Sequence, residues 1–551
     1  MAAKDLWGNE GILGFPIDCN AVLMHLKQDM RDDWFFDSIC YKDLFSKLDD
    51  LKDILCSLVL EDNGIYTGNT RTMHDIPKKG LGIRYALETD FYDRFIYQAI
   101  CSFLIKFYDP LLSYRVLSHR YNKHRANEKY IFKNRIELWK TFEGITFTFL
   151  KDEKALLATD LINYFENISL QRVKESFERL IPEIKANGKE KLQIRNAIAT
   201  LCALLEKWSY SDKHGLPQNR DASSFIANVI LNEVDYNMTK MGYDYYRYVD
   251  DIRIICDSQQ QARKALNDLI KELRTVNMNI NSAKTKILIP DTPSSEICSF
   301  FPNYDDRSEK VDTMWKSRSR RVIARSIPLI CSLIRDCIEK GESQSRQFRF
   351  AVNRLSMLAE ADIFDIQSEL SSKLVEIMLT TLSEQPASTD QYCRLLSILN
   401  LTSDNIKKLE SFLADDSIAI HSWQNYHLWF LLARKKYSSE ILSAVAKERI
   451  RKNPESAEAA AIFIFLHCTE TSASMSQFMD IFSAKWPYQN KRHFLFAAKD
   501  IETKLLLPEI STKTRATISR AIPYFSSDGT PISQKEKHSF FELFDNISEY
   551  E

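Results

Sequence analysis

Two adjacent carboxylates, Asp250 and Asp251, stand between two short runs of apolar and aromatic residues at 243–248 and 252–256. Neither run has a helical period, and aromatic and β-branched residues favour strands. The pattern predicts a tight hairpin with both carboxylates at its tip. Such carboxylates repel each other unless a cation lies between them, and oxygen ligands of this kind suit Mg²⁺. An isolated Asp-Asp pair is more often a solvated turn, so the prediction depends on other residues of the chain.

A third carboxylate, Asp160, follows a short apolar run at 155–159 that reads as a buried strand. A helix is expected after the next turn, with Ser169 as its N-cap. Asp160 therefore lies at the exit of a core strand, where a charged side chain is costly unless it is paired or metal-bound.

Cationic residues occur in three further segments. A glycine-containing loop at 76–84 holds Lys78, Lys79 and Arg84 and could bring amides and cations to a phosphate, although such a loop is also a common surface turn. Residues 118–135 mix cations with aromatics, as a groove for a nucleic-acid strand or a solvated helical face would. A concentrated basic helix is expected over 314–326. The cations singled out in the last two segments are Arg120, Lys123, Arg125, Arg318, Arg320, Arg321 and Arg325.

In two more segments, polar residues are expected directly before a helix or a strand begins. The loop 214–220 contains Gln218 and leads into a long helix that Asp221 is expected to cap, which places free amides near any anionic substrate. Residues 279–289 predict a turn that feeds a strand, with Lys284 at the turn.

Composition narrows the class of protein. With 74 Lys and Arg against 75 Asp and Glu, the net charge of −1 gives no general attraction to polyanions, so any nucleic acid must bind in a local basic channel. The 11 cysteines show no Cys-x-x-Cys pair, which argues against a zinc site and for reduced thiols in the cytoplasm. No apolar run approaches the length of a membrane span, and no signal peptide is expected.

The order Asp160, Leu216-Pro217-Gln218, Tyr248-Val249-Asp250-Asp251, Lys284 resembles the motif series of reverse transcriptases, over roughly residues 75 to 325. Ser223, Ala227, Asn228 and Leu231 extend the second motif. The resemblance implies a right-hand polymerase core of α+β class, with fingers and palm built on an antiparallel sheet with helices. It also implies that dNTPs and nucleic acid are the partners and that DNA is the product.

The resemblance also assigns roles. Asp160, Asp250, Asp251 and the main chain of Leu161 would hold two Mg²⁺ ions, with Mn²⁺ as a substitute, to stabilise the attacking and leaving oxygens. Phe165 is similar to the steric gate that excludes a 2′-hydroxyl. Residues expected to bind the dNTP are Lys78, Lys79, Arg84, Leu161, Phe165, Gln218 and Lys284. Residues expected to bind nucleic acid are Arg120, Lys123, Arg125, Arg220, Arg318, Arg320, Arg321 and Arg325.

One departure from the family pattern stands next to Gln218. Asn219 and Arg220 occupy the place where the family usually has Gly, which permits a close backbone approach to the template. The added bulk and charge predict synthesis that is poorly templated or restricted to a particular template.

The expected domains are an N-terminal helical segment at 1–75, fingers and palm at 76–300, a thumb-like basic connection at 301–345, an all-α repeat-like domain at 346–525 and a polar tail at 526–551. This layout resembles bacterial abortive-infection and defence-associated reverse transcriptases. That likeness implies anti-phage defence in the cytoplasm, a homo-oligomer, and priming by a tyrosine hydroxyl, with Tyr392, Tyr426, Tyr437, Tyr488, Tyr524 and Tyr550 as candidates. Two alternatives stay open: a conventional templated enzyme that works with a dedicated non-coding RNA, and a non-catalytic scaffold.

Overall fold

The computed structural model describes residues 11–41, 44–45, 48–61, 66–123, 130–301, 306–470, 473–483 and 485–498. The chain divides into two compact units. The first comprises Met1–Asp33, Lys47–Met73 and Ala86–Phe301, and the second comprises Trp34–Ser46, His74–Tyr85 and Pro302–Glu551. The first unit thus ends close to the predicted palm boundary, whereas residues 74–85, predicted as fingers, group with the second unit.

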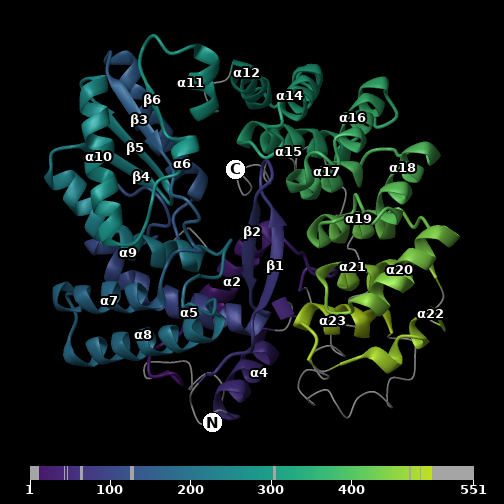
Figure 1. The fold of residues 1–551 in the computed structure, drawn as a ribbon, viewed down its shortest axis with the longest axis horizontal. Helices are drawn as coiled ribbons and strands as arrows, with labels where there is room; N and C mark the ends of the chain where they lie inside the picture. The colour runs from purple at the N-terminus through teal and green to yellow at the C-terminus, as the bar shows by residue number, and fades with distance from the viewer. Residues whose placement is uncertain are drawn as a thin grey trace. The chain divides into compact units, whose positions relative to one another are not determined.

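The first unit contains an antiparallel four-stranded sheet in the order β4-β5-β3-β6, which lies between helices (Figure 1). Its strands are β3 (Ala155–Thr159), β4 (Asp244–Tyr248), β5 (Asp251–Cys256) and β6 (Lys286–Leu288). Every residue of β3 is buried, as its apolar sequence predicts for a central strand. Thr159 pairs with Ile252, and Tyr248 pairs with Asp251, so the end of β3 and the tip of the β4–β5 hairpin lie at the same edge of the sheet.

Helices cover both faces of this sheet. Helix α10 (Gln259–Thr275) packs on β3 and β5 from one side through Ala262, Ala265, Leu269 and Leu273, which recur at helical spacing. Helix α6 (Arg135–Lys151) lies on the other side of the sheet. Phe301, which follows α11 (Ser294–Phe300), packs on this same side. Leu156, Ile255 and Leu288 form a core cluster on this second face with Phe149.

The remaining helices of the first unit surround α5 (Phe91–Tyr108), which is buried on almost every side because its apolar residues do not keep to one stripe. It packs against α2 (Cys19–Asp29), α8 (Gly188–Trp208) and α9 (Asp221–Lys240). The other helical elements are η1 (Met30–Asp32), α4 (Leu48–Glu61), η2 (Asp109–Leu111), α7 (Leu170–Leu180), η4 (Ile181–Glu183) and η5 (Ser282–Lys284). As predicted, Ser169 caps α7 by accepting the amide hydrogen of Arg172 at 3.2 Å.

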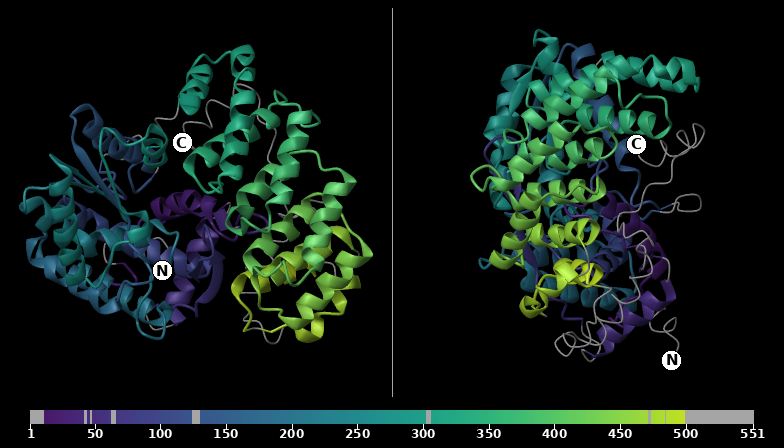
Figure 2. Two further views of the ribbon diagram at one scale, coloured as in Figure 1. Left: turned by 45° about the horizontal axis from the view of Figure 1, so that its top comes forward. Right: turned by 90° about the vertical axis from the view of Figure 1, so that its right-hand side faces the viewer.

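The second unit is a stack of helix pairs in two rows, visible in Figures 1 and 2. One row holds α14 (Ile327–Glu339), α16 (Glu369–Thr380), α18 (Ser403–Ala414) and α20 (Glu440–Lys452). The other holds α15 (Arg346–Glu360), α17 (Thr389–Leu396), α19 (Ser422–Arg434), α21 (Ala457–Thr469) and α23 (Tyr488–Ala497). Short elements are η7 (Pro386–Ser388), α22 (Ala473–Ser476) and η8 (Met479–Ile481). This helical region agrees with the predicted fold class.

A segment from the N-terminal part of the chain completes the second unit. The Trp34 carbonyl accepts hydrogen bonds from His427 and from the Trp423 indole at 3.0 Å, and the Phe36 carbonyl accepts one from Tyr426 at 2.6 Å. Asp37 forms a fully buried ion pair with Arg492 at 2.6 Å. The helical stack is therefore not built from the C-terminal half of the sequence alone.

Two predictions about local structure are wrong. The basic helix expected over 314–326 is broken into α12 (Asp306–Lys316) and α13 (Arg320–Ala324), with Arg318 between them at a φ of 51°. A non-glycine residue in this left-handed region ends a helix. Asp221 is the first residue of α9 rather than its cap, and Arg220 precedes it without a side-chain capping bond.

The hairpin of β1 (Thr72–Pro77) and β2 (Ile83–Glu88) forms a separate two-stranded sheet. Its turn closes with a hydrogen bond from the Lys78 amide to the Gly82 carbonyl at 2.7 Å, and Gly80 takes a φ of 83° there. None of the 11 cysteines, all of which lie within the described ranges, forms a disulfide. In the described part of the chain, no helix combines the length and the apolar character needed to cross a membrane.

Candidate active site

The hairpin tip that carries Asp250 has a strained backbone. Val249 and Asp250 form the two-residue loop between β4 and β5, and Val249 has a φ of 56°. Two-residue hairpins favour positive φ at the first loop position, where Gly or Asn is usual and a β-branched residue is an outlier. The Val249 amide donates to the Ser118 hydroxyl at 2.9 Å, and the Val249 carbonyl accepts from Arg247 at 2.8 Å. These bonds hold the tip in a conformation that valine does not favour.

A fully buried ion pair supports this tip from below. Arg247 and Asp235 have no exposed side-chain surface, and their two hydrogen bonds measure 2.6 and 2.7 Å. Arg247 also donates to the amide oxygen of Asn228 at 2.8 Å, and Asn228 donates to the Ser118 carbonyl at 2.8 Å. A buried arginine is stable when its donors are satisfied in this way. The network joins α9, β4 and the 113–118 segment around Val249.

The carboxylate of Asp160 lies beside the hairpin because β3 pairs with β5 up to Thr159. The main-chain carbonyl of Asp160 accepts a hydrogen bond from the Asn281 amide at 2.6 Å. This bond holds the turn that carries Lys284 against Asp160. The Lys284 ammonium forms an ion pair with the Asp160 carboxylate. The structure thus brings together four residues that the sequence singled out: Asp160, Asp250, Asp251 and Lys284.

The electrostatics of these groups show how close they are. Burial raises the pKa of Asp250 well above its usual value, and the charges of Asp160 and Asp251 and a hydrogen bond with Asp160 raise it further. Burial lowers the pKa of Lys284, but the hydrogen bond and charge of Asp160, with Asp250 and Asp251, outweigh it and raise that pKa. Without a divalent cation, this concentration of negative charge is balanced in part by Lys284.

The donor set suits Mg²⁺. Asp160 is 6% exposed, and its Oδ1 atom is buried without a hydrogen-bond partner, so one hard oxygen points to no protein donor. Leu161, predicted to contribute its carbonyl, lies next to it in a bridge with Ile280. Within the described residues, no three His, Cys, Asp or Glu side chains are already arranged around one metal position, and one oxygen of Asp160 is taken by Lys284. The residue types suit the ion, but the carboxylates would have to draw closer around it, and Lys284 would have to leave that oxygen of Asp160.

Phe165 and the Gln218 loop are joined by the main chain. The Leu216 amide donates to the Phe165 carbonyl at 3.0 Å, and Gly215 donates to the Ile168 carbonyl at 2.9 Å. Gly215 has a φ of 99°, and a Cβ there would lie 2.5 Å from the Tyr210 ring. The Ser223 hydroxyl donates to the Pro217 carbonyl. The predicted gate and the loop of the second motif therefore form one structural feature.

The prediction of poor templating assumed that Arg220 adds a charge at the template-facing side of the loop, and this assumption is wrong. Asn219 has a φ of 54°, the left-handed conformation for which Gly is usual and which Asn tolerates best among other residues. The Arg220 side chain, 3% exposed, turns inward to Asp33 at 3.2 Å and to Glu88. The charge that Arg220 adds therefore does not project from the loop.

Arg220 is correspondingly not a surface cation for nucleic acid, contrary to the prediction. Arg120 is also engaged within the protein, because its guanidinium donates to the Asp109 carboxylate at 2.6 Å and to the carbonyls of Ser113 and Val116. Arg125 lies outside the described residues. Lys123, Arg318, Arg320, Arg321 and Arg325 are exposed, and their role stays a prediction.

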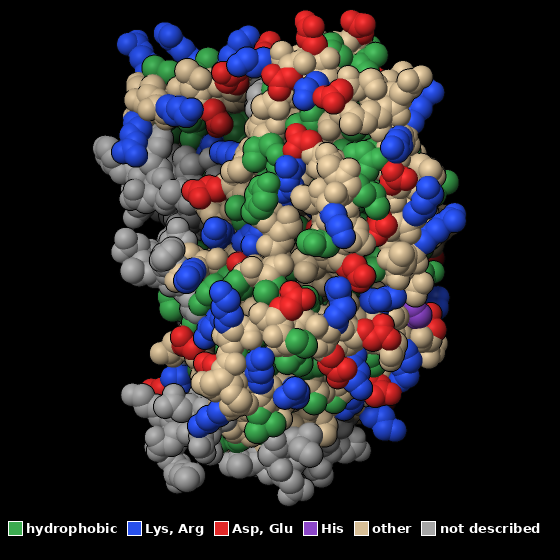
Figure 3. All heavy atoms as spheres, turned by 90° about the vertical axis from the view of Figure 1, so that its left-hand side faces the viewer, with side chains coloured by type: hydrophobic (Ala, Val, Ile, Leu, Met, Phe, Trp, Pro, Cys, Tyr) green, Lys and Arg blue, Asp and Glu red, His purple; other side chains and the backbone are tan. Residues whose placement is uncertain are grey.

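The cations predicted for the triphosphate, Lys78, Lys79 and Arg84, lie at the β1–β2 turn and in β2, in the second unit. The Arg84 guanidinium lies 5.5 Å from the centre of the Trp34 ring. Their role also stays a prediction. On the face of the molecule in Figure 3, acidic and basic side chains are interspersed, in keeping with the near-zero net charge.

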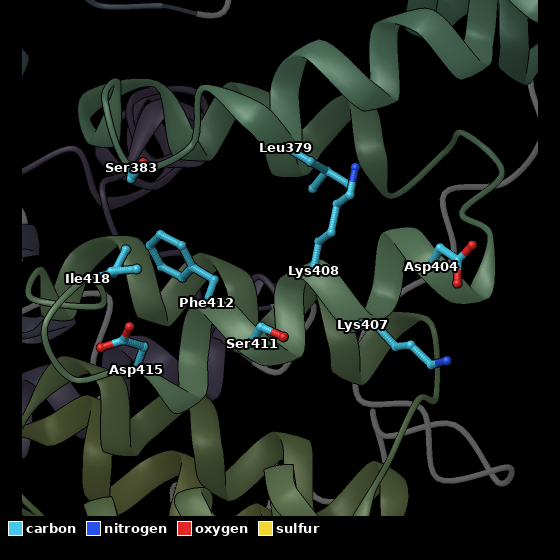
Figure 4. Close-up of a pocket in the computed structure, with 9 residues that line it drawn as sticks. All are labelled: Leu379, Ser383, Asp404, Lys407, Lys408, Ser411, Phe412, Asp415 and Ile418. Carbon is cyan, nitrogen blue, oxygen red and sulfur yellow. The ribbon is translucent and has the colours of Figure 1, made fainter.

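A shallow groove of about 450 Å³ lies in the second unit, between α16 and α18 (Figure 4). Leu379, Phe412 and Ile418 contribute apolar surface. Lys408 extends toward α16, where it pairs with Glu376 at 2.5 Å. The groove contains no cluster of carboxylates among the residues that line it, and we assign it no chemistry.

Sequence reasoning missed the residues that hold the site together. Ser118, Asp235, Arg247 and Arg253 all have buried side chains. Arg253 donates to the Thr146 hydroxyl at 2.9 Å and to the Phe300 carbonyl at 2.6 Å, and so joins β5 to α6 and α11. A signal was present for Arg247 and Arg253, since each is a lone cation inside an apolar strand.

Comparison with known proteins identifies the class. The family described as reverse transcriptase (RNA-dependent DNA polymerase) matches residues 76–354, just over half of the 551-residue chain. The chain belongs to this family, and it is therefore a nucleotidyltransferase of the RNA-directed DNA polymerase class. A solved structure of apo telomerase from Candida tropicalis is similar over 82% of this chain and 74% of that chain, with 13% identity and a TM-score of 0.28.

Proposed function

We propose that this protein copies RNA into DNA from dNTPs with two Mg²⁺ ions held by Asp160, Asp250, Asp251 and the Leu161 carbonyl. The observation that supports it is the meeting of Asp160, at the end of β3, with the β4–β5 tip and with Lys284. When bound, the ions would lower the barrier to attack of a 3′-oxygen on the α-phosphorus by stabilising the attacking and leaving oxygens.

The side chains of the site do the remaining work. Asp250 is presented by a tip that Ser118 and Arg247 hold in place. Lys284 is positioned to exchange its contact with Asp160 for the charge that develops on the leaving pyrophosphate. In this proposal the sugar and base of the nucleotide lie against Phe165 and the Gln218 loop, which the Leu216 amide joins to each other.

Primer extension tests this function. Purified protein with a DNA primer on a heteropolymeric RNA template, dNTPs and Mg²⁺ or Mn²⁺ should extend the primer, and Asp250→Asn should lower the rate by at least about 1000-fold. Asp257→Asn is the matched control, because Asp257 follows the same strand and its carboxylate is 77% exposed and paired with Lys154. Equal primer extension by the Asp250 variant and wild type would contradict the role of Asp250, whereas full biological activity of Asp250→Asn and Asp251→Asn would support the scaffold alternative.

We further propose that the enzyme acts in anti-phage defence in the bacterial cytoplasm as a homo-oligomer, on a template that includes a non-coding RNA. The support is the layout, a polymerase core followed by a stack of helix pairs. Cells that carry the wild-type gene should survive phage challenge, whereas Asp250→Asn and Asp251→Asn should abolish protection. Nuclease digestion of co-purified nucleic acid would identify an RNA partner.

Protein priming is part of the same proposal, and burial narrows the candidates. Tyr392 and Tyr426 have no exposed surface, so neither hydroxyl is accessible to a nucleotide. The Tyr488 hydroxyl is also buried, although the residue is partly exposed, whereas Tyr437 is partly exposed; Tyr524 and Tyr550 lie outside the described residues. Incubation with each labelled dNTP and Mg²⁺, without added nucleic acid, should transfer label to the protein, and substitution of the primer tyrosine by Phe should abolish it.

A further inference from the structure

A buried network of charges surrounds the start of α9 in the first unit, directly after the Gln218 loop. Its cations are the guanidinium groups of Arg94 and Arg220, 3% and 4% exposed. Its anions are Asp29 and Asp33, from the N-terminal segment, with Glu88 at the end of β2 and Asp221 at the start of α9. The reverse-transcriptase motifs include none of these residues, and the polymerase chemistry described above uses none of them.

Arg94 ties the N-terminal segment to the core helix α5. Its guanidinium donates to Asp33 at 2.7 and 2.8 Å and to Asp29 at 2.6 Å. Because all three side chains are nine-tenths buried or close to it, each charge depends on the others for its solvation. The position of Asp33 is therefore fixed by α5 before Arg220 is considered.

Arg220 uses that fixed carboxylate to hold the loop. Its guanidinium donates to Asp33 at 3.2 Å and to Glu88, and it also donates to the carbonyl of Asn219 at 2.8 Å. The carbonyl that accepts this last bond belongs to Asn219, whose backbone is in the left-handed conformation. Arg220 thus fixes the main chain directly after Gln218, besides fixing its own side chain.

The first residue of α9 is held from two further directions. The Asp221 amide donates to the Asp29 carboxylate at 3.2 Å, an anion at the positive end of the helix. The Asp221 carboxylate contacts Nε2 of His25 and Nε2 of His119, each at 3.0 Å. Three segments far apart in the sequence, 25–33, 88–94 and 119, therefore converge on 219–221.

We propose that Arg220, with Asp33 and Glu88, is a clamp that positions Gln218 for nucleotide selection, so that residues 25–33 are part of the polymerase site. If the loop moved outward, the largely buried Glu88 carboxylate would lose its ion pair with Arg220 and Asp33 would keep only Arg94, and a buried charge that loses its counter-ion is strongly destabilising. This inference rests on the proposed function for the role of Gln218, and it concerns positioning rather than catalysis.

The experiment compares Arg220→Met, Arg220→Lys, Asp33→Asn and Glu88→Gln with Arg179→Met in the full-length protein. Arg179 is the matched control, because it pairs with Glu233 at 3.5 Å on the surface of the same unit, where the two side chains are 46% and 43% exposed. Two quantities are measured: hydrogen exchange of the 213–221 amides, and KM and kcat for a single dNTP on a DNA primer annealed to an RNA template. Arg220→Lys keeps the charge but cannot reach both carboxylates in the same geometry.

The clamp predicts faster exchange at 213–221 in the Met, Asn and Gln variants and a KM raised about tenfold with kcat changed less than about threefold. Arg220→Lys should fall between wild type and Arg220→Met, and Arg179→Met should match wild type. Unchanged exchange in the loop, or a fall in kcat at constant KM, would overturn the clamp. If Arg220→Met does not fold, Asp33→Asn and Glu88→Gln decide the question. Absence of primer extension by the wild type would refute the proposed function, while hydrogen exchange would still test the clamp.

Discussion

Val249 donates its amide hydrogen to the hydroxyl of Ser118 at 2.9 Å, and this bond connects the tip of the β4–β5 hairpin to a segment outside the reverse-transcriptase motifs. We predict that Ser118→Ala leaves this amide without an acceptor, lowers the free energy of unfolding by about 1–3 kcal/mol and lowers kcat about tenfold. Urea unfolding and primer extension measure the two effects.

Ser113→Ala is the control, since the Ser113 hydroxyl also accepts a main-chain amide, that of Arg115, at 3.2 Å. It should leave kcat within about twofold of wild type. A Ser118 variant that loses stability but keeps full activity would show that the tip does not depend on this bond.

The second prediction concerns Asp235, which lies under the same tip. Asp235→Asn should destabilise the first unit by about 3–5 kcal/mol, because it leaves the fully buried Arg247 without its counter-ion. Asp244→Asn removes a carboxylate from the same region, but that group is 44% exposed and pairs with Arg115, so the loss should be below about 1 kcal/mol. Denaturant titrations measure the two losses in the free energy of unfolding. Equal losses for the two variants would contradict this ranking.

The meeting of the three carboxylates was predictable because their signals are local. Asp160 follows a buried strand, Asp250 and Asp251 lie between two strand patterns, and β pairing brings such ends to one edge. The buried ion pairs of Arg220 were not predictable, because its partners Asp33 and Glu88 are far away in the sequence and a cation in a loop is usually solvated. The buried face of a short helix is also hard to predict: Ile441 on α20 is apolar, yet it is 53% exposed.

The third prediction is that protonation of His427 lowers the stability of the folded protein in mild acid. Burial lowers the pKa of His427 to about 4, against about 6.5 in an unfolded chain. A lowered folded-state pKa means that the stabilisation is complete above about pH 6.5 and is lost as the pH falls toward 4; the loss at pH 5 is about 2 kcal/mol. His427→Gln keeps a donor for the Trp34 carbonyl, so its stability should fall less steeply over this range. Parallel pH profiles for the two proteins would contradict the assignment.

The fourth prediction tests sugar selection by Phe165, which is partly exposed and tied to the Gln218 loop through Leu216. Phe165→Ala should lower the ratio of kcat/KM for a dNTP to that for the matching ribonucleotide by at least about tenfold, because the space for a 2′-hydroxyl opens. Phe165→Tyr keeps the ring and should retain the preference. An unchanged ratio in the Ala variant would place the gate elsewhere.

The fifth prediction follows from the ion pair between Lys284 and Asp160. Lys284 competes with a divalent cation for one carboxylate oxygen and also offsets the charge of Asp250 and Asp251. Lys284→Met should therefore lower the Mg²⁺ concentration for half-maximal activity about threefold, because a more negative site attracts the ion more strongly. It should also lower kcat about tenfold, because the cation near the leaving group is lost.

A magnesium titration of primer extension separates these two effects. Lys286→Met is the matched control, since Lys286 lies two residues further along, on β6, and pairs with Glu296 at 3.5 Å rather than with an active-site carboxylate. It should change neither quantity by more than about twofold. If Lys284→Met instead required more Mg²⁺ than wild type, the lysine would act as an organiser of the metal site and not as a competitor for it.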